Sequence, residues 1–212
     1  MSDSDVSHMV LRRPSLLGFS IESRYVTVIQ FLQSLEQTRK YQRVLVRYPQ
    51  IFFYSPKRHL EPQLAFLSKL LNFGVEANQM VTSFPPLLWL SQELILEKLN
   101  FLQTTLQLSD EEIKKLLLTL PSVLGLSIEN NLSPTIQFLQ DVFLTKERLQ
   151  ETVIYQPALL AYSLEKRLKP RVERMRECDI FIDYAPPYIM SMTETHFEDW
   201  IEGQTSSWTS LS

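Results

Sequence analysis

The segment Pro157-Ala158-Leu159-Leu160-Ala161-Tyr162-Ser163 decides the fold, because its pattern returns at regular intervals along the chain. Each copy, called an anchor below, begins with a proline, has an apolar residue three positions later and a serine six positions later. Successive anchor prolines are separated by 35, 36, 36 and 36 residues. A period of this length is typical of stacked helical units that cannot bury their apolar faces alone. The copies are PSLLGFS (14–20), PQIFFYS (49–55), PPLLWLS (85–91), PSVLGLS (121–127) and PALLAYS (157–163).

Further prolines mark the first helix of each repeat. Pro62, Pro134 and Pro170 each lie seven residues after an anchor serine, and inside a helix each would cost about 3 kcal/mol. At the first helical position a proline costs little, so we expect helices to begin there, with Ser133 as one N-cap. The short segment between anchor serine and proline fits a single 3₁₀ turn. A Phe-Leu pair recurs in these helices at 31–32, 66–67, 101–102 and 138–139, with one residue fewer before it in the third repeat.

A second helix fills the rest of each period. In the third repeat, Ser109-Asp110-Glu111-Glu112 forms a capping box that predicts a helix from here to Pro121. Ile113, Leu116, Leu117 and Leu120 mark its buried face. We expect equivalent helices at 38–48, 75–84 and 145–155.

The predicted fold is all-α, an α-solenoid of about five helix–helix–3₁₀ repeats of 35–36 residues. Residues 1–10 are predicted to be a disordered N-terminus, 11–202 the repeat array with its C-terminal cap, and 203–212 a disordered tail. Pro186-Pro187-Tyr188-Ile189-Met190 is interpreted as a sixth, altered anchor, followed by a short capping helix that uses Phe197, Trp200 and Ile201.

Composition excludes several classes of site. One cysteine, Cys178, permits no intrachain disulfide, and three scattered histidines give no zinc-type spacing. Four glycines are too few and too dispersed for a phosphate-binding loop. There is no apolar run of about 18 residues to cross a bilayer. We therefore expect no cofactor, no bound metal, no membrane contact and no catalytic site.

The repeats resemble the mitochondrial transcription termination factor (mTERF) family, whose motif combines P-x-L-L, S-x-E-x-x-L-x-P and a helix with Phe-Leu. Residues 157–170 match it best, residues 121–139 nearly as well, and the resemblance extends over roughly residues 10–202. It implies a curved α-solenoid that binds nucleic acid in mitochondria or chloroplasts, where family members act in transcription, RNA processing or ribosome assembly. Tetratricopeptide and pentatricopeptide repeats have similar periods but lack this proline anchor.

Charge supports nucleic-acid binding only in parts of the chain. The net charge is −3, whereas duplex-binding domains are usually basic. Residues 1–60 carry a net +5 and residues 161–177 a net +3, while 61–160 carry −5 and 178–212 carry −6. The candidate contacts therefore form two clusters. The N-terminal cluster is Arg39, Lys40, Arg43, Arg47, Lys57 and Arg58, and the C-terminal cluster is Lys166, Arg167, Lys169, Arg171, Arg174 and Arg176.

The C-terminal cluster leads to a specific hypothesis. Arg171 and Arg174 share a face of the helix that begins at Pro170, from which both could reach neighbouring phosphates. Replacing both with glutamate is predicted to weaken binding and leave the fold intact, because surface substitutions usually cost within about 0.5 kcal/mol.

The predicted function is nucleic-acid binding, to double-stranded DNA or to RNA, that regulates organellar gene expression through transcription termination or RNA processing. We expect a monomer, located in a mitochondrion or chloroplast on the strength of the resemblance. The first six residues are acidic, unlike a transit peptide. The alternative is a protein-interaction scaffold without nucleic-acid binding, which would use the acidic middle repeats.

Overall fold

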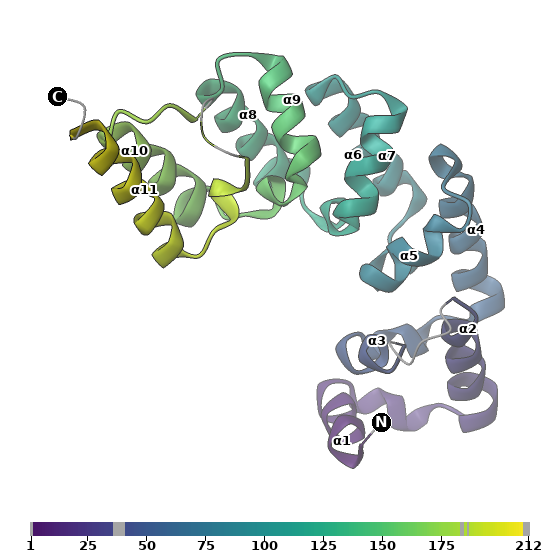
Figure 1. Cartoon of the computed structure of the whole chain (residues 1–212). Coiled ribbons are helices and arrows are strands. Elements are labelled where there is room, and N and C mark those ends of the chain that lie inside the picture. The colour runs from purple at the N-terminus through teal and green to yellow at the C-terminus, as the bar shows by residue number, and fades with distance from the viewer. Residues whose placement is uncertain (1, 36–40, 183–184, 186, 210–212) are drawn as a thin grey trace. The chain divides into compact units, whose positions relative to one another are not determined.

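The computed structural model describes residues 2–35, 41–182, 185 and 187–209, and within these ranges all regular structure is helical (Figure 1). The predicted all-α repeat fold is confirmed. The chain divides within helix α6 into two compact units, Met1–Glu97 and Lys98–Ser212, and each is described by itself. The α-helices are α1 (Asp3–Arg12), α2 (Thr27–Leu35), α3 (Tyr41–Arg47), α4 (Glu61–Lys69), α5 (Glu76–Ser83), α6 (Gln92–Leu106), α7 (Asp110–Thr119), α8 (Ser133–Val142), α9 (Lys146–Tyr155), α10 (Lys169–Glu177) and α11 (Glu194–Thr209).

Each anchor folds as a 3₁₀ turn that begins at its proline. The residue two positions after the proline is almost completely buried in all five copies, which makes the anchors the fixed points of the core. The turns are Pro14–Gly18, Pro49–Phe53, Pro85–Leu88, Pro121–Gly125 and Pro157–Ala161. A further 3₁₀ turn, Leu70–Asn72, follows α4.

The α-helical part of the first helix starts one residue before the predicted prolines, at Glu61, Ser133 and Lys169, so these predicted starts are confirmed. A further helical turn, which was not predicted, extends each helix back to the residue after the anchor serine. The backbone N–H of Leu60, Leu132 and Leu168 donates to the carbonyl of the anchor serine five residues earlier, at 3.3, 3.0 and 3.2 Å. These bonds make a π-helical turn, so the predicted 3₁₀ turn at this place is wrong. Ser133 lies inside the helix, at φ −60° and ψ −53°, and is not an N-cap. The π-helical turns are Ile21–Val26, Pro56–Leu60, Ile128–Leu132 and Leu164–Leu168.

The third repeat explains the π-helical turns. A π-helical turn holds one residue more than an α-helical turn. Ser55 and Ser127 each lie 11 residues before the phenylalanine of the Phe-Leu pair, whereas Ser91 lies 10 residues before Phe101. In agreement, α6 starts at Gln92 and is α-helical from its first residue, with no π-helical turn. The segment from anchor serine to phenylalanine is therefore one residue shorter in the third repeat because it lacks the extra residue that a π-helical turn contains.

The anchor serines cap these helices. The hydroxyl of Ser163 accepts the backbone N–H of Lys166 at 3.2 Å, and Ser20, Ser91 and Ser127 make the same contact. Ser55 precedes Pro56 and makes no such hydrogen bond. Because an N-cap hydroxyl satisfies a backbone donor that has no other partner in the helix, four of the five serines stabilise their helices directly.

Ser163 and Ser55 form a matched pair for mutation. Ser163→Ala is expected to lower the free energy of unfolding by about 1 kcal/mol, the usual cost of losing an N-cap. Ser55→Ala is expected to change it by less than about 0.5 kcal/mol, because no cap hydrogen bond is lost. Urea unfolding followed by circular dichroism measures both. Equal effects of the two substitutions would contradict the capping role.

The second helices agree with the sequence analysis where they are described. In α7 the Ser109 hydroxyl accepts from the Glu112 backbone N–H, and the Glu112 carboxylate accepts from the backbone and hydroxyl of Ser109. These hydrogen bonds hold the pKa of Glu112 below its ordinary value. Thr145 caps α9 as its predicted range implies. The start of the helix predicted at 38–48 lies outside the described residues, and α3 accounts for its remainder.

The ends of the chain contain more helix than expected. Helix α1 occupies residues predicted to be disordered, and it has a complete capping box at Ser2 and a buried Met9. Helix α11 continues to Thr209, beyond the predicted end of the array at 202. The sixth anchor is confirmed as the 3₁₀ turn Pro187–Ser191. Phe197 and Ile201 of α11 are buried as predicted for the cap.

Candidate nucleic-acid interface

One position in the first helix of each repeat is always buried. This inward-facing position lies eight residues after the anchor serine, or seven in the shortened third repeat. Its five residues account for four of the five buried polar side chains in the described part of the chain. They are Val28, Gln63, Lys98, Thr135 and Arg171.

The long polar side chains at the inward-facing position bind the next anchor. Gln63 donates to the carbonyls of Leu87 and Leu90 at 2.9 and 3.0 Å, and the ammonium of Lys98 donates to the carbonyl of Leu124 at 2.7 Å. A 3₁₀ turn leaves its last carbonyls without backbone partners. The inward-facing side chains supply the missing donors, so their role is to join successive repeats.

Arg171 makes the most extensive of these contacts. Only 2% of Arg171 is exposed, and its guanidinium donates to the carbonyls of Ile189, Met190 and Met192 at 2.8 to 3.1 Å. Glu194 accepts a further hydrogen bond from it at 2.9 Å. The hypothesis that Arg171 lies on the surface and binds phosphate is therefore wrong. Its guanidinium is bound to the sixth anchor and to the residues directly after it.

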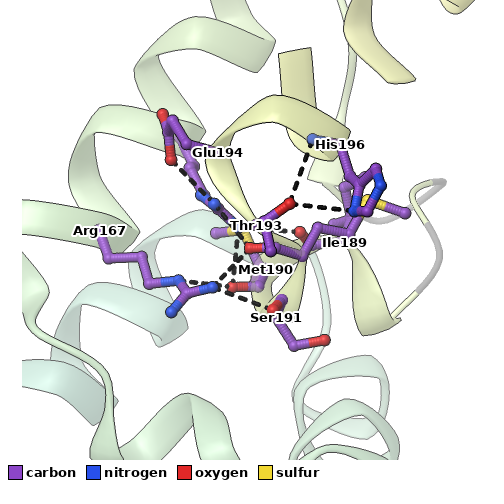
Figure 2. A network of polar contacts seen from close by, with 9 residues as sticks. Arg167, Ile189, Met190, Ser191, Thr193, Glu194 and His196 are labelled. Atoms are coloured by element: carbon purple, nitrogen blue, oxygen red, sulfur yellow. Dashed lines mark hydrogen bonds and ion pairs between the residues drawn. The ribbon is translucent and has the colours of Figure 1, made fainter. Parts of the chain in front are cut away.

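Arg167 binds the same turn from the preceding helical turn. Figure 2 shows its guanidinium directed at the carbonyls of Met190 and Ser191, at 3.1 and 3.0 Å, and a third bond reaches Met192 at 2.6 Å. The guanidinium also lies over the ring of Tyr162, 4.2 Å from its centroid. Arg167 and Arg171, called the arginine pair below, hold the turn Pro187–Ser191 against α10.

The rest of the C-terminal cluster is largely neutralised. Lys169 pairs with Glu165, and Arg174 pairs with Glu198 at 3.1 Å and Glu177 at 3.5 Å. The hydrogen bond from Arg174 to Glu198 raises the pKa of the guanidinium, which remains charged. Only Lys166 and Arg176 of this cluster are exposed and without an ion pair among the described residues.

The N-terminal cluster differs from the C-terminal cluster in exposure and in pairing. Its described members, Arg43, Arg47, Lys57 and Arg58, are exposed and form no ion pair with another described residue. Arg43 and Arg47 lie four residues apart on α3 and therefore share one side of it. Lys57 and Arg58 lie on the π-helical turn Pro56–Leu60. Arg39 and Lys40 lie outside the described residues.

A groove of about 900 Å³ opens beside Lys57 and Arg58. One wall is the first helix of repeat one, Ile21–Leu35, and the other is the first helix of repeat two, Pro56–Lys69. Arg24 lines it from the first wall, and the second wall contributes Lys57, Arg58 and one acidic residue, Glu61. The remaining polar lining is Gln30 and the hydroxyl groups of Ser23, Thr27, Ser34, Ser55 and Ser68, of which those of Thr27 and Ser34 already donate to backbone carbonyls of their own helix. Cations with hydroxyl donors suit a phosphate backbone.

The sequence analysis missed Arg24, because this arginine lies outside the dense basic run at 39–58. A usable signal was present in the repeat alignment. Arg24 lies four residues after Ser20, and Arg58 lies three residues after Ser55, so both follow an anchor serine within one helical turn. Stacked repeats place such positions on neighbouring helices, which brings two distant arginines to one groove.

Other functional groups are sparse. No cluster of three His, Cys, Asp or Glu side chains suited to a metal occurs among the described residues. None of the described helices is both long and apolar enough to span a membrane. Cys178 is half-buried at the C-terminal end of α10. The exposed basic groove of the first unit is therefore the strongest candidate site.

The anchors, capped first helices and inward-facing positions define a class, the all-α proteins built from stacked helical repeats. The mTERF family profile matches residues 1–109 and 37–198, and the chain belongs to the mTERF family. Members of this family are helical-repeat proteins that bind nucleic acid in organellar gene expression. No curated protein sequence matches the chain.

Proposed function

We propose that this protein binds nucleic acid and regulates gene expression in a mitochondrion or chloroplast, and that its first unit makes the main contact. Membership in the mTERF family supports the general role. The observation that supports the location is the difference between the two basic clusters. Four of the six C-terminal cations bind carbonyls or carboxylates of the protein, whereas Lys57 and Arg58 are exposed at the groove.

Electrostatics favour this location further. Phosphate contacts by Lys and Arg supply most of the affinity of sequence-independent nucleic-acid binding. A cation that already has a carboxylate partner in the protein gains less from a phosphate, because binding must first break the existing pair. The contacts we propose are Arg24, Arg43, Arg47, Lys57 and Arg58, with Lys166 and Arg176 as the accessible remainder of the second cluster.

No catalytic activity is part of this proposal. The role is binding and positioning on DNA or RNA, with transcription termination and RNA processing as the two steps the family suggests. A monomer suffices for it, because the groove and its cations all belong to one unit of one chain.

Replacing Lys57 and Arg58 together with alanine tests the proposal. We expect affinity to fall and the plot of log K against log salt concentration to become less steep by about 1.8 for duplex DNA, or about 1.4 for a single strand, if both side chains contact phosphates. Filter binding at several salt concentrations measures both quantities.

A matched control removes the same charge elsewhere. Lys115 and Lys146 are exposed cations of the second unit, outside either cluster, and their double alanine variant is expected to retain the wild-type slope. If the wild-type protein binds no duplex, hybrid or single strand at low salt, the proposal is wrong. The protein-interaction scaffold would then take its place.

A further inference from the structure

We infer that the first unit binds single-stranded nucleic acid in preference to duplex, by stacking bases on a row of aromatic side chains beside the basic groove. The inference deepens the proposed function and rests on it. It concerns the 3₁₀ turns of the three anchors in Met1–Glu97, where the residue that follows each turn is aromatic. These residues are Phe19, Tyr54 and Trp89.

The aromatic side chains form two groups of contacting rings, joined through the adjacent residues Phe53 and Tyr54, and are together called the aromatic row. Phe19 contacts Phe53 edge to face, with ring centroids 5.3 Å apart. Tyr54, the next residue, stacks on Trp89 at 5.7 Å with an interplanar angle of 11°. Tyr48 packs against the same indole at 6.1 Å. Three anchors separated by 35 and 36 residues in sequence thus contribute to one row.

The row is accessible to a ligand. Phe53 is 39% exposed, and the other four rings are half-buried. Buried aromatic residues of the same size, such as Phe52 at 1% exposure, fill the core beneath. A ring held by its neighbours yet partly exposed loses little conformational entropy when a base stacks on it.

Cations accompany the row. The guanidinium of Arg24 lies 5.4 Å from the centroid of the Phe19 ring, and that of Arg47 lies 5.4 Å from the centroid of Tyr48. Arg24 also lines the groove, so it connects the row to the groove directly. The opposite wall of the groove follows directly in sequence after Phe53 and Tyr54, and it includes Ser55, Lys57 and Arg58.

This combination matches the chemistry of single-strand recognition. A basic groove follows the phosphate backbone, and aromatic rings stack on successive bases without reading their sequence. In a duplex the base faces are already stacked on each other, so only phosphates and groove edges are presented to the protein. Aromatic side chains beside a phosphate site therefore add affinity only for unpaired bases.

The contrast with the second unit supports the same conclusion. There the residues that follow the anchor turns are Leu126, Tyr162 and Met192. The ring of Tyr162 is covered by Arg167, whose guanidinium is bound to the carbonyls of the sixth anchor. An equivalent row is absent from the described residues of that unit.

Fluorescence anisotropy with labelled 12-nucleotide probes tests the inference, using single-stranded RNA, single-stranded DNA of the same mixed sequence, and the corresponding duplexes. We expect both single strands to bind more tightly than the duplexes. Phe53→Ala is expected to weaken single-strand binding roughly tenfold or more, the usual effect of losing one base–aromatic stack, and Phe53→Tyr to restore it. The RNA and DNA arms decide which strand is preferred.

Tyr155→Ala is the control, because Tyr155 is an aromatic residue of the second unit, 65% exposed, and its loss should not alter binding. Circular dichroism confirms that each variant is folded. Duplex binding equal to or tighter than single-strand binding, or unchanged single-strand affinity of Phe53→Ala, would overturn the inference and leave the proposed function intact. If the wild-type protein binds none of the probes, the proposed function itself is refuted.

Discussion

Arg171→Ala is expected to release the C-terminal cap and lower the free energy of unfolding of the second unit by about 3–5 kcal/mol. The side chain is buried, and the carbonyls of Ile189, Met190 and Met192 each lose a charged donor when it is removed. Each hydrogen bond from a charged donor is worth about 1.5–3 kcal/mol. The carbonyls of Met190 and Met192 keep their hydrogen bonds from Arg167, and that of Ile189 keeps the backbone N–H of Met192, so the loss is that of the charged donor itself. The guanidinium also packs 4.6 Å from the centroid of Phe197, so truncation leaves a cavity as well.

Hydrogen exchange locates this effect. Backbone amides of 187–201 should lose protection in Arg171→Ala, while those of residues 41–90 keep it. Arg176→Ala is the control on the same helix, since Arg176 is exposed, and is expected to change stability by less than about 0.5 kcal/mol. Unaltered protection of 187–201 in Arg171→Ala would mean that the arginine pair does not hold the turn.

The contacts of Arg171 change the expected result of replacing Arg171 and Arg174 with glutamate. Substituting glutamate for both Arg171 and Arg174 would place a carboxylate against the carbonyls of Met190 and Met192, where charges of one sign repel. Weakened binding of that double variant would then report an unfolded cap and not a lost phosphate contact. Lys57 and Arg58 avoid the problem, because both are exposed.

The period alone predicted the helices and the anchors, because both depend on local sequence. A proline fixes its own backbone angle, and a serine at the right distance caps a helix wherever the helix lies. The capping box at Ser109 and the start of α9 after Thr145 were therefore found correctly. No tertiary contact was needed to predict them.

The π-helical turns were not predicted, although the sequence contains a sign of them, namely one extra residue between the anchor serine and the phenylalanine in the repeats that have such a turn. The spacing from anchor serine to phenylalanine is 11 residues at Ser55 and 10 at Ser91. Hydrophobic periodicity at 3.6 residues per turn does not distinguish a helix with an extra residue from one that starts later. The hydrogen bond from the backbone N–H of Leu60 to the carbonyl of Ser55 distinguishes the two kinds of helix, and only the structure shows it.

The burial of Arg171 could not be predicted from a pattern of apolar residues. The inward-facing position holds Val28, Gln63, Lys98 and Thr135 in the other repeats, a mixture that shows no hydrophobic signal. Gln63, Lys98 and Arg171 donate hydrogen bonds to carbonyls of the following anchor, a contact that the sequence of their own helix does not reveal. The candidate site depends on stacking in the same way, since Arg24 and Lys57 meet only when neighbouring repeats pack.

Leu160→Asp is expected to cost more than about 4 kcal/mol and to unfold the fifth repeat. Leu160 is 1% exposed, so the substitution removes a buried side chain, at about 2–5 kcal/mol, and inserts a carboxylate with no partner. Leu17 occupies the same position of the first anchor but is 75% exposed.

Leu17→Asp is therefore expected to change stability by less than about 0.5 kcal/mol, although the sequence motif treats the two leucines alike. Urea unfolding with hydrogen exchange over each anchor measures both variants. At the internal anchors the same position is buried, with Phe52, Leu88 and Leu124 2% exposed or less, and the ring of Tyr25 from the preceding repeat lies 4.7 Å from that of Phe52. Equal costs at Leu17 and Leu160 would show that burial at this position follows from the anchor itself. A larger cost at Leu160 than at Leu17 is the expected result, because in a repeat protein the burial of a residue depends on the neighbouring repeat as well as on its own sequence.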